Sequence, residues 1–176
     1  MKQAFILQGW YQKIDSNWYP WLKRELEKRG FTVFLPNLPT MHTDLPDMVK
    51  QLSFIEKLMS IDKNTVIFGH SLGALLGMRL AEKYMLDKLF LIAGWDYDDL
   101  QKPHESFWPS KINHKFIKKN VKKIIVISSD NDPYYTTNAG KEMAGRLGAK
   151  FILIKGAGHL TDKDGMIRIT ELHSLI

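Results

Sequence analysis

The chain has 176 residues, 44% of them hydrophobic and 25% charged, which is the usual balance of a globular domain with a sizeable core. It has no cysteine, which excludes disulfides, thiolate catalysis and cysteine-bound metal and agrees with a cytoplasmic location. The net charge of +6 comes largely from lysines between positions 111 and 123. An apolar segment borders these lysines, which favours an exposed surface over a nucleic-acid site. Neither a signal peptide nor a membrane span is expected.

Apolar segments and helical patterns alternate along the chain. Most of the apolar segments are continuous runs of Ile, Val, Leu and Phe, which is typical of strands buried on both faces of a parallel sheet. The segment 96–121 is expected to be mostly irregular, with one short helix near Ile112–Asn120. In chain order, the patterns predict a strand over Ala4–Leu7, a helix over Trp18–Arg29, a strand over Thr32–Leu35, a helix over Pro46–Met59, a strand over Val66–Phe68, a helix over Leu72–Tyr84, strands over Leu89–Ala93 and Ile124–Ser128, a helix over Thr137–Leu147, a strand over Phe151–Lys155 and a closing helix over Asp164–Leu175.

This order of elements predicts a single α/β domain over residues 1–176. Repeated strand–helix units give right-handed crossovers, so we expect a three-layer sandwich with helices on both faces of a mostly parallel six-stranded sheet. No large lid domain is expected. With the strand order 2-1-3-4-5-6, strands 1 and 3 flank the switch point where ligands bind at the carboxyl ends of such sheets.

The segment Gly69-His70-Ser71-Leu72-Gly73 matches the G-x-S-x-G pattern of a nucleophile elbow. It lies between a predicted buried strand and a predicted helix, where a sharp turn would expose the hydroxyl of Ser71. The alternative interpretation is that Ser71 only caps the following helix. The loop Gln8-Gly9-Trp10-Tyr11 follows strand 1 and would be its neighbour, so we expect the backbone N–H groups of Trp10 and Leu72 to form an oxyanion hole.

A histidine and a carboxylate follow the last two predicted strands. His159 lies in Gly158-His159 directly after the sixth strand, which makes it the best of the six histidines as a general base. Asp130 and Asp132 both follow the fifth strand, and Asp132 is favoured because Pro133 fixes the backbone beside it. The chain order Ser71, Asp132, His159 is that of α/β-hydrolases, whereas turn and capping roles are the alternative for each residue taken alone.

The chain resembles the small serine-hydrolase family of retinoblastoma-binding protein 9 and the YdeN-like bacterial proteins, within the α/β-hydrolase superfamily. The resemblance implies that Ser71 is the nucleophile, His159 the base and Asp132 its orienting acid. It departs from the family at one point, because Gln8 stands where members have a histidine that supports the oxyanion loop. The similar segments are 17–22 (Asn-Trp-Tyr-Pro-Trp-Leu), 36–39 (Pro-Asn-Leu-Pro), 69–73, Asn131-Asp132-Pro133, Leu147-Gly148-Ala149 and Gly158-His159.

These observations predict a serine hydrolase that cleaves a small carboxylic ester or a related acyl substrate, with amide or peptide cleavage left open. The alternative is a protein-binding module on a hydrolase scaffold, with a protein partner in place of a small-molecule substrate. No metal or organic cofactor, nucleic acid or membrane is expected as a partner. Aromatic residues expected near the site, as pocket lining or as cover for the core edge, include Tyr11, Trp95, Trp108 and Tyr134.

Overall fold

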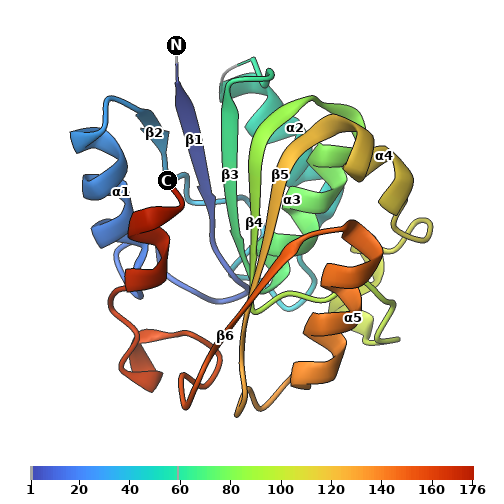
Figure 1. The fold of residues 1–176 in the computed structure, drawn as a ribbon. Helices are drawn as coiled ribbons and strands as arrows, with labels where there is room; N and C mark the ends of the chain where they lie inside the picture. The colour runs from blue at the N-terminus through green and yellow to red at the C-terminus, as the bar shows by residue number, and fades with distance from the viewer. Residues whose placement is uncertain (1, 59) are drawn as a thin grey trace.

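Six parallel strands form the central sheet in the order β2-β1-β3-β4-β5-β6, which confirms the predicted order (Figure 1). The computed structural model describes residues 2–58 and 60–176. Because the winding direction reverses between β1 and β3, the loops that follow these two strands lie side by side. The strands are β1 (Gln3–Leu7), β2 (Thr32–Phe34), β3 (Thr65–His70), β4 (Leu86–Ile92), β5 (Val121–Ser129) and β6 (Lys150–Ile154).

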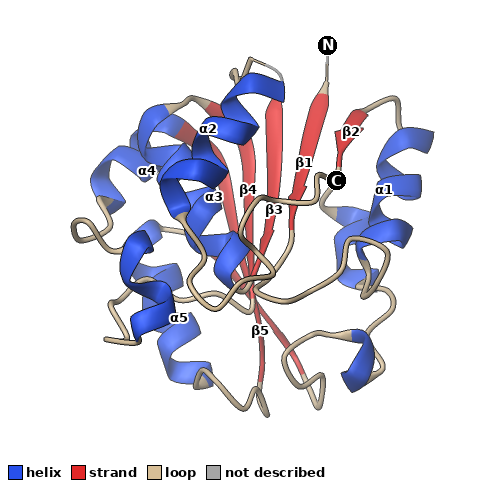
Figure 2. Ribbon diagram, turned by 180° about the vertical axis from the view of Figure 1, so that it is seen from behind, coloured by secondary structure: helices blue, strands red, loops and turns tan. Residues whose placement is uncertain are grey.

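Helices cover both faces of the sheet, as the continuous apolar strands predict. One face packs on α1 (Tyr19–Lys28) and on the C-terminal segment, which together bury one hydrophobic cluster. The other face packs on α2 (Met48–Leu58), α3 (Leu72–Lys83), α4 (His114–Asn120) and α5 (Thr137–Leu147), over a second cluster (Figure 2). None of the helices in the described part of the chain is long and apolar enough to cross a membrane.

The closing helix predicted over Asp164–Leu175 is wrong. Two short 3₁₀ helices, Asp162–Asp164 and Thr170–Ser174, stand in its place. Gly165 has a φ of +80°, which ends the first of them, and the chain then crosses to the second without helical structure. Ile169 and Leu172 are fully buried, so their apolar spacing reflects packing on α1 and the sheet rather than an α-helix.

Smaller differences lie at the ends of elements and between β4 and β5. The helix predicted over Pro46–Met59 begins later, at Met48, and Met59 lies outside the described residues. The segment 96–121 contains α4 as expected, together with a 3₁₀ helix over Lys102–Phe107 that was not predicted. Phe107 is fully buried in the second cluster, so this short helix is anchored to the core.

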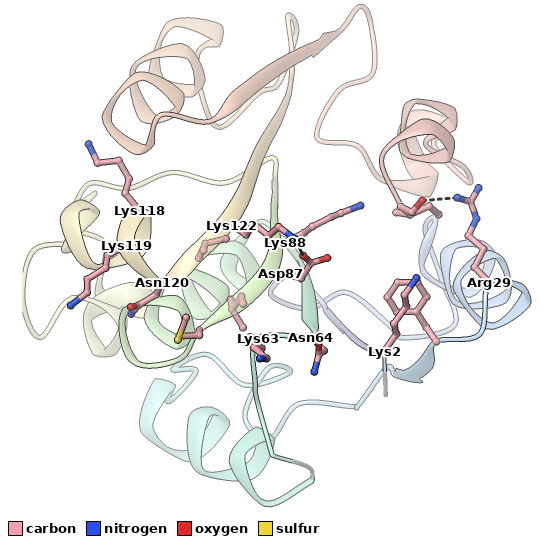
Figure 3. Close-up of a pocket in the computed structure, with 15 residues that line it drawn as sticks. Lys2, Arg29, Lys63, Asn64, Asp87, Lys88, Lys118, Lys119, Asn120 and Lys122 are labelled. Atoms are coloured by element: carbon pink, nitrogen blue, oxygen red, sulfur yellow. Dashed lines mark hydrogen bonds and ion pairs between the residues drawn. The ribbon is translucent and has the colours of Figure 1, made fainter.

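A group of cations lies at the amino ends of the strands. All six lysines between positions 111 and 123 are exposed, as predicted. Three of them surround a cavity of about 1010 Å³ at this end of the sheet, together with cations that precede β1, β2 and β3 and one within β4 (Figure 3). Ser71 lies at the opposite, carboxyl ends of the strands, so this cavity is remote from it.

Candidate active site

Ser71 occupies a strained turn between β3 and α3. Its φ of +53° and ψ of −119° are unfavourable for a residue with a side chain, and the turn is held by a hydrogen bond from its N–H to Ile92 O at 2.9 Å. Its hydroxyl makes no capping hydrogen bond to the helix, which is evidence against the alternative that Ser71 serves as a cap. Glycine is required at Gly73, because a Cβ there would lie 2.3 Å from Leu7 O.

His159 and Asp132 come together at the same edge of the sheet. His159 Nδ1 lies 2.8 Å from Asp132 Oδ2, and the other carboxylate oxygen accepts a hydrogen bond from the N–H of Tyr134 at 2.8 Å. Asp130 is turned elsewhere and accepts from the N–H of Gly156. The side chain of Asp132 is 3% exposed, so the carboxylate is shielded from solvent while it contacts the imidazole.

The loop that carries His159 is held by hydrogen bonds to two side chains, one from further along the chain and one from the loop that follows β5. The N–H of His159 donates to Asp164 Oδ2 at 3.0 Å, and the N–H of Gly158 donates to Asn131 Oδ1 at 2.8 Å. A side chain at Gly158 (φ +53°) would collide with Asp164. Burial alone would raise the pKa of Asp164, but hydrogen bonds from Thr161 and from the N–H of His159 lower it, so the carboxylate stays ionised as an acceptor.

A buried chain of hydrogen bonds connects this loop to the loop after β1. Tyr19 accepts from the N–H of Gly9 at 3.2 Å, and its oxygen lies 2.5 Å from His70 Nδ1. His70 Nε2 lies 2.9 Å from His159 O, so it is the protonated nitrogen of the ring. Burial raises the pKa of Tyr19 and lowers that of His70 to about 3, which keeps Tyr19 as a donor and His70 neutral.

Gln8 supports the loop after β1 in the position where a histidine was expected from the family. The side chain is fully buried, and its amide nitrogen lies 2.9 Å from Gln12 O and 3.2 Å from His42 Nε2. A Cβ at Gly9 would lie 3.1 Å from Ser71 Cβ, so this loop passes directly beside the elbow. The backbone N–H groups of Trp10 and Leu72 have no hydrogen-bond partner among residues 2–58 and 60–176. They therefore remain free to donate to a ligand.

A cavity of about 270 Å³ opens between these loops. Ser71, Leu72, Trp10 and His159 all line it. Neither the hydroxyl of Ser71 nor Nε2 of His159 has a hydrogen-bond partner in the described part of the structure, so both groups are available inside the cavity. They are therefore candidates for a nucleophile and a general base.

The aromatic residues predicted for the pocket divide into two pairs. Trp95 and Tyr134 line the cavity, and the ring of Tyr134 packs edge-on against His159 at 4.7 Å. Tyr11 and Trp108 do not line it. Tyr11 is half exposed and donates its hydroxyl to Asp44, while Trp108 lies near the guanidinium of Arg79 beside a different cavity.

Several residues of this site carry no motif that would reveal them in the sequence. Tyr19 and His70 lie inside similar segments, but their pairing links residues 51 positions apart. Asp164 was assigned to a helix. His104 and Asp99 line the cavity from the segment 96–121, where an irregular chain gives no periodic signal.

Comparison with known proteins points to one family. A family model described as serine hydrolase matches residues 4–176. Serine hydrolase RBBP9 of Rattus norvegicus is 31% identical over 162 residues, covering 90% of this chain and 82% of that protein. YdeN of Bacillus subtilis is 25% identical over 182 residues, covering 99% and 94% of the two chains.

Solved structures share the fold. The crystal structure of the B. subtilis ydeN gene product has a TM-score of 0.89 at 24% identity and covers 99% of this chain and 96% of that one. Est1E from Butyrivibrio proteoclasticus, solved with bound ferulic acid, has a TM-score of 0.73 at 13% identity, with coverage of 99% and 90%. Together with the family match over nearly the whole chain, these similarities lead to one conclusion: the chain belongs to the serine hydrolase family, on an α/β-hydrolase fold.

Proposed function

We propose that the protein hydrolyses small carboxylic esters through an acyl-enzyme on Ser71, with His159 as general base and Asp132 as the residue that orients it. The observation that supports this most directly is the contact of 2.8 Å between His159 Nδ1 and Asp132, with the opposite ring nitrogen free in the cavity that Ser71 lines. That arrangement leaves Nε2 of the imidazole to accept the serine proton.

The reaction proceeds in two steps, acylation of Ser71 and hydrolysis of the acyl-enzyme. Ser71 Oγ attacks the ester carbonyl carbon while its proton passes to His159, and the negative charge that develops on the carbonyl oxygen is met by the N–H groups of Trp10 and Leu72. The bond to the alcohol then breaks, and the alcohol leaves with the proton from His159. Water attacks the acyl-enzyme, gives its proton to His159, and the acid leaves as Ser71 recovers its proton.

The size of the cavity restricts the substrate. Its volume of about 270 Å³ lies just below the range of small-molecule sites, which are typically about 300–1,000 Å³. Aromatic side chains form much of its wall, which suits an apolar acyl or alcohol group. Short esters are therefore better substrates than long-chain lipids.

Active-site labelling tests the proposal. We expect a fluorophosphonate probe to form one covalent adduct, located on Ser71 by mass spectrometry, and to leave the Ser71→Ala variant unlabelled. Ser16→Ala is the matched control, because Ser16 is a serine on the β1–α1 loop whose hydroxyl only donates to Lys13 O. Folded protein that shows no adduct on Ser71, or labelling that persists in Ser71→Ala, would refute the proposal.

A further inference from the structure

A second carboxylate–imidazole pair lines the cavity and has no role in the proposed acyl transfer. His104 Nδ1 lies 2.7 Å from Asp99 Oδ2, and the histidine is 8% exposed. The carboxylate is itself held by the N–H of Gln101, which donates to its other oxygen at 3.3 Å. Because Asp99 takes the hydrogen bond of Nδ1, the remaining nitrogen, Nε2, is the one that can bind a ligand.

His104 is held in place by two tryptophans that also line the cavity. The ring of Trp10 packs edge-on against it at 5.6 Å, and Trp95 lies at 5.2 Å. His104 Nε2 makes no hydrogen bond to any described residue. Among the described residues, Nε2 of His104 is not one of the buried polar atoms left without a partner, so it is open to the cavity. A firmly oriented imidazole with one nitrogen unused is therefore available to bind a ligand there.

The pair lies across an aromatic wall from the proposed base. Ring contacts run from His159 to Tyr135 at 6.0 Å, from Tyr135 to Trp95 at 4.5 Å, and from Trp95 to His104 at 5.2 Å. Tyr135 and Trp95 are stacked at an angle of 17° and present flat apolar surface between the two histidines. A ligand whose carbonyl carbon meets Ser71 would therefore extend along this wall toward His104.

Charge determines which ligand group His104 can bind. No lysine or arginine belongs to the described lining of the cavity, and Asp99 contributes a carboxylate to it. With a neutral imidazole the pair carries a net negative charge, and its free nitrogen is a hydrogen-bond acceptor. A carboxylate or phosphate on the ligand would be repelled, whereas an uncharged hydroxyl would be bound as a donor.

We propose that His104, oriented by Asp99, is the binding site for a hydroxyl group of the substrate, and that the preferred substrates are small, uncharged esters with a hydroxyl at the end remote from the ester bond. This inference rests on the proposed ester hydrolysis for its kinetic test, but the binding site itself does not require turnover. His104 acts in substrate selection, and acyl transfer proceeds at Ser71.

A matched pair of esters tests the preference. Methyl 3-(4-hydroxyphenyl)propanoate and methyl 3-phenylpropanoate differ only in a hydroxyl that is too far from the carbonyl to alter its reactivity. We expect kcat/KM for the hydroxylated ester to be at least tenfold higher with the native enzyme, because a site built to bind a hydroxyl discriminates against the analogue without it. In His104→Phe we expect the ratio of the two kcat/KM values to fall to about one. In His104→Gln, whose amide oxygen can accept a hydrogen bond, we expect a ratio between that of His104→Phe and that of the native enzyme.

His173→Phe is the control, since His173 lies in the last 3₁₀ helix against Trp21, outside the cavity. We expect His173→Phe to keep the kcat/KM ratio of the native enzyme. The inference is overturned if the native enzyme hydrolyses the two esters with kcat/KM values within twofold of each other, or if a tenfold ratio persists in His104→Phe.

A binding measurement separates this inference from the proposed function. In the Ser71→Ala variant, quenching of tryptophan fluorescence reports the binding of 4-propylphenol and of propylbenzene, and we expect the phenol to bind at least fivefold more tightly. Adding His104→Phe abolishes the difference. If this preference holds but neither ester is hydrolysed by the native protein, the proposed function fails and the hydroxyl site stands. If both esters are hydrolysed equally and the two ligands bind equally or not at all, the hydroxyl site fails and the proposed function stands.

Discussion

His70 makes the stability of the protein sensitive to acid in a defined way. The ring is fully buried, and burial lowers its pKa to about 3 from the ordinary value of 6.5. Between these values the unfolded chain binds a proton that the folded protein excludes, so stability rises with pH across this window and is lost as the pH falls below about 6.5. The loss is about 1.4 kcal/mol for each pH unit, which gives about 2 kcal/mol at pH 5.

The contribution of His70 is isolated by comparison with His70→Gln, which has no titrating group at this position but whose amide can still donate to His159 O. We expect the free energy of unfolding of the native protein, minus that of the variant, to decrease by about 2 kcal/mol between pH 7 and pH 5, as measured by urea unfolding. Other titrating groups are common to both proteins and largely cancel in the difference. A difference that stays constant over this range would refute the conclusion that His70 is buried as the neutral ring.

Three further substitutions probe the site and its scaffold. Asp132→Asn lowers kcat by about 10³–10⁴-fold because the base loses its orienting carboxylate. Asp130→Asn, measured in the same ester assay, changes kcat by no more than a few-fold, and equal losses would contradict the assignment of Asp132 as the orienting acid. Gly73→Ala destabilises the protein by about 3 kcal/mol or more in urea unfolding, because its Cβ meets a carbonyl oxygen of β1 at 2.3 Å; Gly145→Ala, with no atom within 4 Å, is neutral or stabilising. Tyr19→Phe leaves a buried N–H and an imidazole nitrogen unpaired, costs about 1–3 kcal/mol and lowers kcat more than it changes KM; an unchanged kcat would show that the hydrogen-bond chain plays no part in catalysis.

The fold was predictable from sequence because its signals are local. Each strand is a short apolar run, and parallel α/β topology allows few strand orders once those runs are counted. The same reasoning was wrong for the C-terminal segment. There Ile169 and Leu172 pack into the core from a 3₁₀ helix and its N-cap, and Asp164 accepts hydrogen bonds from the N–H groups of His159 and Thr161 instead of starting an α-helix.

The site divides in the same way. Ser71, Asp132 and His159 lie in the turns and loops that follow β3, β5 and β6. The parallel sheet brings these loops to one edge, so sequence reasoning could place the three residues near each other. The partners of His104 could not be placed, because they depend on how the irregular segment 96–121 folds back over the cavity. Irregular segments are positioned by individual tertiary contacts, such as the burial of Phe107, and leave no periodic pattern in the sequence.

The group of cations at the amino ends of the strands has a practical consequence for handling the protein. The cations around the large cavity at the amino ends, among them Lys2, Lys63, Lys88 and Lys119, all lie at the end of the molecule remote from Ser71. A sulfonate resin would attract that end and hold the protein in one orientation, with the mouth of the smaller cavity facing the flowing solution. The fold thus provides a noncovalent handle for immobilising the protein without obstructing access to the proposed nucleophile.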